Sequence, residues 1–234
     1  MNNLAGKTVF ITGGTTGIGL ETAKLALEEG ANVVIYSIAV PGSPDITALK
    51  RSARVLIIKG DIRNSKKVKS TVALVIKKFG SIDILINNAA IAQRKEFIKT
   101  NKKDWDLTID INIKGTLIIT QEILKRMLQK KSGMIINISS GAGMDGIGNL
   151  SLYSLSKAAV LNFSQSLHEE VSKKGIDVFT IAPGSTDTKM FHSVFPDHKP
   201  HHTPKAVARI IIKSAKKEIH PDDKLIIDVF YHKT

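Results

Sequence analysis

The stretch that decides the fold is "KTVFITGGTTGIGLETAKLALEEGANVVIYS", residues 7–37. It starts with a short run of mostly β-branched residues, passes through a glycine-rich turn and continues with apolar residues at helical spacing. A second apolar run then ends the stretch. Neither run alternates apolar with polar residues, which is typical of strands buried on both faces of a sheet. The order strand, helix, strand predicts the unit from which parallel sheets are built.

The same pattern repeats along the rest of the chain. Further runs of this kind occupy residues 54–60, 82–88, 133–139, 176–182 and 224–230. Segments of helical periodicity separate them, and right-handed crossovers place such helices on both faces of a sheet. The pattern predicts an α/β fold, a doubly wound seven-stranded parallel sheet of the Rossmann-like type in three α/β/α layers. No repeat or linker divides the chain, so we expect a single domain over residues 1–234, with a short flap around residues 188–203.

The composition excludes several classes of protein. The 234 residues include no cysteine, which rules out disulfides and thiolate metal sites. No stretch reaches the roughly 20 consecutive apolar residues that cross a bilayer, and the first residues do not resemble a signal peptide. We therefore expect a soluble, cytoplasmic protein with no membrane partner.

The net charge of +13 favours anionic partners in general. The lysines, however, are spread over helical segments such as residues 64–80 and 124–133. Neither interleaved aromatic residues nor a recognisable binding motif accompanies them. We therefore interpret them as solvated helix faces and expect no nucleic-acid partner.

The glycine-rich turn is "TGGTTGIG", Thr12 to Gly19. Glycines at this place allow the backbone to turn sharply and to approach a pyrophosphate, while the following helix presents free N–H groups. A tight turn without a ligand is the alternative. Ligands of open parallel sheets lie at the carboxyl ends of the strands, so the position on the first strand favours dinucleotide binding. Asp61 and "NNAA", residues 87–90, follow later strands and fall at the same edge, unless they serve only as turn residues.

A helix predicted over residues 152–167 contains an unexpected pair of polar side chains. Val160 and Leu167 mark its apolar face, and the same stripe runs back through Tyr153 and Lys157. These two residues are four apart, so they lie on successive turns and face the buried side of the helix. Snorkelling at the start of the helix is the structural explanation. A buried phenol beside an ammonium group indicates chemistry.

Together these motifs resemble the short-chain dehydrogenase/reductase family, of the compact single-domain type, over nearly the whole chain. The resemblance rests on the glycine motif, on "NNAA" where the family usually has Asn-Asn-Ala-Gly, on Asn112 in "INIKG", on Ser140 in "INISS", on "YSLSK" at 153–157 for Tyr-x-x-x-Lys, and on "PGSTDT" at 183–188. It implies an oxidoreductase that transfers a hydride between NAD(P)(H) and a carbonyl or alcohol, for example a 3-oxoacyl thioester or a small ketone. The alternative is a non-catalytic dinucleotide-binding regulatory protein of the same fold, a class that tends to lose the reacting residues.

The resemblance assigns a role to each of four residues. Tyr153 exchanges a proton with the substrate oxygen, although a free phenol has a pKa of about 10. A nearby cation favours the phenolate, so we expect Lys157 and the oxidised nicotinamide to lower that pKa. Ser140 donates a hydrogen bond to the substrate oxygen. Asn112 positions a water that links Lys157 to solvent.

The resemblance also implies a larger set of cofactor contacts, in which Thr188 holds the nicotinamide carboxamide. The set comprises Gly13, Thr15, Thr16, Gly17, Ile18, Gly19, Ser37, Asp61, Ile62, Asn88, Ala89, Tyr153, Lys157, Pro183, Gly184, Thr186 and Thr188.

The end of the second strand bears on the choice of cofactor. The position about 20 residues beyond the glycine loop, where a carboxylate binds the ribose of NAD, is Ser37. A small serine leaves room for a 2′-phosphate, although neither Thr16 nor Ile38 is basic. With Arg51 and Arg54 as remote partners for the phosphate, we expect NADP(H) to be preferred over NAD(H).

Two further features concern metals and assembly. Histidines cluster in "HKPHH", residues 198–202, but with few acidic side chains nearby and no fixed geometry they predict no metal site.

The resemblance implies pairing through the helices that contain Asn112 and Tyr153. We therefore expect a homodimer or homotetramer.

Overall fold

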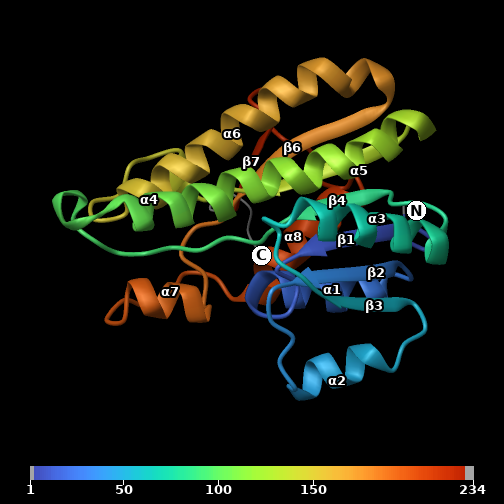
Figure 1. Ribbon diagram of the computed structural model, residues 1–234, viewed down its shortest axis with the longest axis horizontal. Coiled ribbons are helices and arrows are strands. Elements are labelled where there is room, and N and C mark those ends of the chain that lie inside the picture. The colour runs from blue at the N-terminus through green and yellow to red at the C-terminus, as the bar shows by residue number, and fades with distance from the viewer. Residues whose placement is uncertain (1–2, 230–234) are drawn as a thin grey trace.

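The computed structural model describes residues 3–229 and contains a seven-stranded parallel sheet (Figure 1). The predicted strands are confirmed, although Phe230, at the end of the last predicted run, lies outside the described residues. The strands are β1 (Thr8–Thr12), β2 (Asn32–Ser37), β3 (Val55–Lys59), β4 (Ile84–Asn87), β5 (Gly133–Ile138), β6 (Ile176–Ala182) and β7 (Ile226–Asp228).

The strand order confirms the doubly wound topology. It is β3-β2-β1-β4-β5-β6-β7, and every neighbouring pair is parallel. The chain builds outward from β1 to β3 and then returns to add β4 on the other side of β1. The order therefore reverses between β1 and β4, and a parallel sheet opens a crevice for ligands at such a point.

Helices cover both faces of the sheet and complete the three predicted layers (Figure 1). Residues of α1, α2 and α8 join one apolar core, and residues of α3, α5 and α6 join the other. Alternate residues of β1 serve the two cores, Val9 and Ile11 on one face and Phe10 on the other. The helices are α1 (Gly17–Glu28), α2 (Pro44–Lys50), α3 (Ser65–Phe79), α4 (Lys102–Thr108), α5 (Thr116–Lys130), α6 (Ser151–Val171), α7 (Lys189–Val194) and α8 (Pro204–Ala215).

A π-helical turn, Ile109–Gly115, joins α4 to α5. Gly115 lies so close to Ile62 that an added Cβ would approach the Ile62 Cγ2 to 2.5 Å. Asn112 lies within the widened turn and is only 2 % exposed. Such turns are often found at functional sites, because the extra residue re-aims the side chains of the helix.

Residues 188–203 contain a short helix, α7, where the sequence predicted an irregular loop or flap. Thr188 starts this helix by accepting a hydrogen bond from Phe191 N. The two ends of the segment are tied together, since Asp187 N and His201 N donate to the carbonyls of His202 and Ser185. The segment thus leaves the sheet after β6 and returns to its starting point before α8 (Figure 1).

Lysine side chains gather where the helices end. The last turns of α2, α3, α5 and α8 all carry lysine, at positions 50, 77, 78, 130 and 213. Cations are favourable there because the carboxyl end of a helix carries partial negative charge. The lysines of α3 are exposed, as expected for a solvated face. None of the described helices is long and apolar enough to span a bilayer.

Candidate active site

The turn after β4 is bound to the end of β1 across the reversal point. Thr12 Oγ1 accepts hydrogen bonds from the backbone N–H groups of Asn88 and Ala89, at 3.0 Å each. The Asn88 side chain donates in return to the carbonyls of Thr12 and Gly13, at 3.0 and 3.2 Å. "NNAA" therefore does more than form a turn, because it fixes the spacing between the two strands that flank the crevice.

The glycine-rich loop is shaped by close approaches of backbone. Gly17 has a φ of +55°, a conformation that favours glycine. A Cβ on Gly19 would lie 2.6 Å from both the Asn88 side-chain nitrogen and the Gly13 carbonyl oxygen. The loop has no room for side chains at these positions, and it passes directly over the turn that follows β4.

The helix after this loop begins without a side-chain cap. The Thr16 side chain makes no capping hydrogen bond, whereas α2, α3, α4, α7 and α8 are each capped by the side chain that precedes them. The first N–H groups of α1 therefore remain available to an outside acceptor. Free donors at the positive end of a helix fit a pyrophosphate, so the donor set here suits a dinucleotide.

The other end of the cofactor set lies beside the loop. Thr188 Cγ2 would be 3.2 Å from a Cβ on Gly17, so the segment after β6 meets the glycine loop directly. The Pro183 carbonyl accepts from Gly141 N at 3.0 Å, which places the segment after β6 against the one after β5. Thr186 Oγ1 donates to the Gly184 carbonyl and stabilises this turn.

The structure corrects the expectation about the 2′-phosphate. The Ser37 and Thr15 hydroxyl groups are hydrogen-bonded to each other at 2.9 Å, so Ser37 lies at the glycine loop as predicted. Arg51 and Arg54, however, precede β3 and lie at the opposite edge, where the Arg54 carbonyl accepts from Val33 N. The sheet register instead places Lys59 beside Ser37. Which basic residue lies beside Ser37 depends on the strand register, and that register is set only in the folded sheet.

Asp61 and Ile62 are held by the protein itself. The Asp61 carboxylate is bound by the Arg63 guanidinium at distances of 2.6 to 3.0 Å, which lowers the pKa of Asp61 below its ordinary value. The Asp61 carbonyl accepts a hydrogen bond from the Tyr36 hydroxyl. Ile62 is buried in the core under the π-helical turn. Both residues keep their place at the carboxyl edge, after β3.

Ser140, Tyr153 and Lys157 lie close together in the structure. Burial raises the pKa of Tyr153, and a hydrogen bond with Ser140 lowers it in part. The expected lowering of the Tyr153 pKa by Lys157 is not seen, since burial raises this pKa and Ser140 is the group that opposes the rise. Lys157 Nζ lies 5.7 Å from the centre of the Tyr153 ring and donates instead to the Ile138 carbonyl, at 2.8 Å.

Lys157 does not snorkel. It is only 4 % exposed, and burial lowers its pKa to about 8. The loop after β5 closes over it, since a Cβ on Gly143 would be 2.9 Å from the Lys157 Cβ. The prediction of an inward-facing lysine is therefore confirmed, and its ammonium is held at a cost in free energy.

The Asn112 side chain is fully engaged with the protein. Its oxygen accepts from Ile91 N, and its nitrogen donates to the Ile91 carbonyl and to Ser156 Oγ at 3.0 Å. Ser156 donates in turn to the Tyr153 carbonyl, at 2.7 Å. Ser156 is thus a residue that the sequence analysis missed, although it lies between the two residues of the Tyr-x-x-x-Lys motif. The Asn112 amide joins the turn after β4 to the helix that carries Tyr153.

The histidines near residue 200 have separate partners. His192 contacts the Asp187 carboxylate at 2.7 Å, His201 contacts Ser185 at 2.7 Å, and the His198 ring packs on Phe195. Within residues 3–229, no three histidine or acidic side chains are grouped so as to hold a metal ion.

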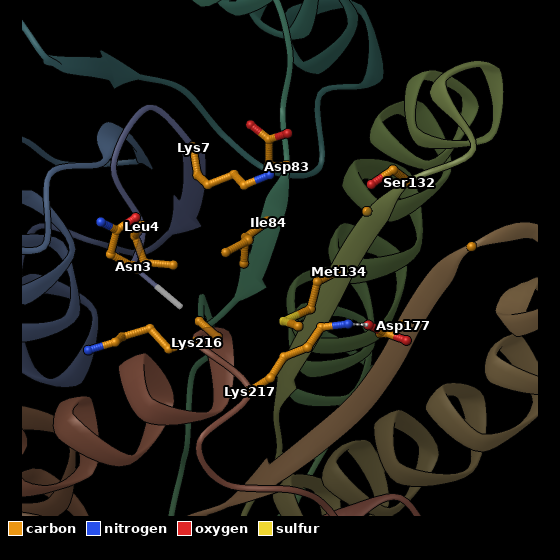
Figure 2. Close-up of a pocket in the computed structure, with 13 residues that line it drawn as sticks. Asn3, Leu4, Lys7, Asp83, Ile84, Ser132, Met134, Asp177, Lys216 and Lys217 are labelled. Atoms are coloured by element: carbon orange, nitrogen blue, oxygen red, sulfur yellow. Dashed lines mark ion pairs between the residues drawn. The ribbon is translucent and has the colours of Figure 1, made fainter. Parts of the chain in front are cut away.

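A cavity of about 390 Å³ lies at the other edge of the sheet (Figure 2). It opens where β4, β5 and β6 begin, and the Lys217–Asp177 ion pair crosses one side of it. Leu4, Ile84 and Met134 contribute apolar lining. Because the catalytic candidates lie at the carboxyl edge, this cavity is separate from the candidate active site.

The family is established by comparison with known proteins. Residues 7–199 match the model of a family described as short chain dehydrogenase. The chain belongs to the short-chain dehydrogenase family. An uncharacterized oxidoreductase of Staphylococcus aureus strain MW2 is 31 % identical over 220 residues, which cover 94 % of this chain and 95 % of the relative. Oxidoreductase UcpA of Salmonella typhimurium is 36 % identical over 206 residues, or 86 % and 77 % of the two chains.

Solved structures agree with this assignment. The crystal structure of Cj0485 dehydrogenase superposes with a TM-score of 0.85 at 25 % identity, and the match covers 100 % of this chain and 98 % of that one. This short-chain dehydrogenase is therefore an oxidoreductase with a fold that binds a nicotinamide cofactor.

The buried lysine generates a prediction about stability. Each pKa unit corresponds to about 1.4 kcal/mol, so the fall of the Lys157 pKa from 10.5 to about 8 implies a cost to folding of about 3 kcal/mol below pH 8. Lys157→Met removes this cost but leaves the Ile138 carbonyl without its donor, at about 1 kcal/mol. We expect Lys157→Met to raise the Tm at pH 7 by about 5 °C.

The sign of the pH dependence follows from the two pKa values. Unfolded lysine binds its proton up to about pH 10.5, whereas folded Lys157 releases it above about pH 8, so the penalty fades between these values. The Tm difference between Lys157→Met and wild type is expected to shrink as the pH rises from 8 to 10. Lys103→Met, at an exposed position, is the control. A lower Tm for Lys157→Met at pH 7 would contradict the prediction.

Proposed function

We propose that the protein reduces a carbonyl group, or oxidises the corresponding alcohol, with NAD(P)(H). The observation that carries the proposal is the meeting of Ser140, Tyr153 and Lys157 at the same sheet edge as the uncapped helix α1. Thr188, which lies against Gly17, brings the segment after β6 to this place. A regulatory protein of the same fold has no need of a buried lysine beside a tyrosine, so this arrangement favours an enzyme.

The protein's own groups supply the proton chemistry. Tyr153 donates a proton to the carbonyl oxygen during reduction and accepts one during oxidation. Ser140, already bonded to Tyr153, donates a hydrogen bond to the same oxygen as negative charge grows on it. The Lys157 ammonium lies close enough to favour the phenolate form once the Tyr153 proton has been released. The nicotinamide, when bound, supplies or accepts the hydride.

The remaining residues of the predicted set are proposed to hold the cofactor. The N–H groups of residues 16–19 bind the pyrophosphate, Asn88 and Ala89 line the crevice, and Thr188 holds the carboxamide. Asn112 is proposed to position the reaction by fixing Ile91 and Ser156, and not through a water on its side chain. Residues 188–203 serve as a flap over the substrate.

Tyr153→Phe tests the proposed reaction. The variant keeps the ring but has no proton to exchange, so we expect turnover to fall at least about a thousand-fold while cofactor affinity stays within a few-fold. The measurement is steady-state reduction of a carbonyl panel, together with a fluorescence titration of NADPH. Tyr36→Phe removes a phenol hydroxyl that donates to the Asp61 carbonyl and not to the reacting groups, so it is the matched control and should change turnover only a few-fold. Undiminished turnover in Tyr153→Phe would disprove the assignment.

We also propose that NADP(H) is preferred over NAD(H). No carboxylate stands at Ser37, and Lys59 is its neighbour in the sheet register. Ser37→Asp should reverse the preference, because a carboxylate repels the 2′-phosphate but accepts a hydrogen bond from a ribose hydroxyl. We expect NADPH affinity to fall about ten-fold or more. The measurement is a pair of titrations on each protein, and a wild type that strongly prefers NADH would refute the proposal.

The assembly is proposed to be a homodimer or homotetramer formed through α5 and α6. Leu117 on α5 and Leu155 on α6 are large apolar side chains exposed in the single chain. Light scattering at micromolar concentration is expected to give a multiple of the 25.5 kDa chain mass. A monomeric mass would contradict this.

A cytoplasmic location and the absence of a nucleic-acid partner stay predictions.

A further inference from the structure

The segment that follows β4 carries an arginine between two fixed points. Ile91 is bound on both its N–H and its carbonyl by the Asn112 side chain. Lys95 N donates to the Asn149 carbonyl at 2.8 Å, just before α6. Arg94 lies between these anchors, so its backbone is held beside the helix that carries Tyr153.

The Arg94 side chain reaches across to the flap. Its guanidinium carbon lies over the Phe195 ring, 5.1 Å from the ring centre. Phe195 ends α7, and Thr188 at the start of the same helix lies against Gly17 of the cofactor loop. The guanidinium therefore lies between the segment after β4 and the flap, on the side of the sheet where the reaction is proposed to occur. A cation over an aromatic face is held in place without using its N–H donors.

Arg94 is an exposed residue, and its donors have no acceptor in the described part of the chain, so they face solvent and are open to a ligand. Arg94 takes part in no ion pair or hydrogen bond there, whereas its neighbour Lys95 is paired with Asp104. Of the carboxylates nearby in the sequence, Glu96 is paired with Lys99. A guanidinium that is held in place and has free N–H groups suits a carboxylate or phosphate, which it binds through two parallel hydrogen bonds.

Exposed apolar side chains lie on the two segments that contact the Arg94 region, the segment after β5, which reaches Asn149, and α7, which Phe195 follows. Met144 and Ile147, after β5, are 44 % and 40 % exposed, and Met190 on α7 is 36 % exposed. The first of these segments lies on the catalytic helix, because Gly143 is packed against Lys157. Large apolar side chains that are left exposed around a reacting centre favour an apolar ligand.

We propose that Arg94 binds an anionic group of the substrate, and that the substrate is a carbonyl compound with an apolar chain ending in a carboxylate or phosphate. The inference rests on the proposed function, and it adds the substrate class. Tyr153 and Ser140 act on the carbonyl, the exposed methionines and Ile147 contact the chain, and Arg94 pairs with the anion while Phe195 holds it in place.

A binding experiment tests the proposal without turnover. Octanoate, octyl phosphate and the neutral methyl octanoate are titrated by calorimetry into the protein saturated with NADPH. We expect wild type to bind at least one of the two anions more tightly than the ester. Arg94→Gln should weaken that anion about 10- to 100-fold and leave the ester unchanged, as for the loss of a charged, two-point hydrogen bond. The two anions separate a carboxylate substrate from a phosphate one.

Three variants serve as comparisons. Lys173→Gln removes the same charge from an exposed position just before β6, at the opposite edge of the sheet, and should change neither affinity. Arg94→Lys keeps the positive charge but not the paired N–H donors of the guanidinium. Phe195→Leu removes the ring on which the guanidinium lies. Both variants should therefore lose part of the anion affinity. Unchanged Tm values for all variants would show that folding is intact. Equal anion affinity in Arg94→Gln and wild type, an equal loss in Lys173→Gln, or no anion binding by wild type would overturn the inference.

Turnover separates this inference from the proposed function. Aliphatic oxo acids are assayed beside their methyl esters with wild type and Arg94→Gln. A rise in KM of about 10- to 100-fold for the acids alone supports the inference. Reduction of esters and acids with no effect of Arg94→Gln overturns it and leaves the proposed function standing. Binding of anions that depends on Arg94, without reduction of any carbonyl, supports an anion site at Arg94 but contradicts the carbonyl substrate and the proposed function.

Discussion

Thr12 Oγ1 accepts the N–H groups of Asn88 and Ala89 and so ties β1 to β4 at the one place where the strand order reverses. Two further features of the site adjoin these hydrogen bonds. The glycine loop leaves β1 next to these hydrogen bonds. Gly19 has no Cβ because the Asn88 side chain occupies that space. The turn after β4 then continues to Ile91, which the Asn112 amide holds. The same few hydrogen bonds thus position both the proposed cofactor site and the catalytic helix.

The buried lysine shows the cost of that arrangement. A lysine that is 4 % exposed and has a pKa of about 8 reduces the stability of the fold, and its hydrogen bond to Ile138 offsets only part of the loss. Tyr153 pays no such penalty, because a neutral phenol is the form that burial favours. The protein therefore favours a protonated Tyr153 phenol beside a protonated Lys157 ammonium group. A developing charge on a substrate or cofactor is what shifts this balance, since the protein alone keeps the pKa of Tyr153 high.

Periodicity was sufficient to predict the strands, the two helical layers and the inward direction of Lys157, because these follow from local spacing and burial. Three features needed the folded chain. Lys59 replaces Arg51 and Arg54 as the neighbour of Ser37, since register decides which edge a residue occupies. The Asn112 amide is occupied by Ile91 and Ser156, which are contacts between distant segments. Residues 188–203 contain α7, a helix that Thr188 caps and whose six residues are too few to show helical periodicity.

The net charge of +13 is a poor guide to the substrate. In a doubly wound sheet every crossover helix runs antiparallel to the strands. Helices that end in lysine therefore place those cations at the edge where the strands begin. The reacting groups lie at the other edge, about a strand's length away, and salt screens exposed charges over roughly 10 Å. The lysines therefore balance helix dipoles and contribute little to what binds at the carboxyl edge. The anion selectivity proposed for this edge instead rests on a single group, Arg94, whose guanidinium lies over the Phe195 ring.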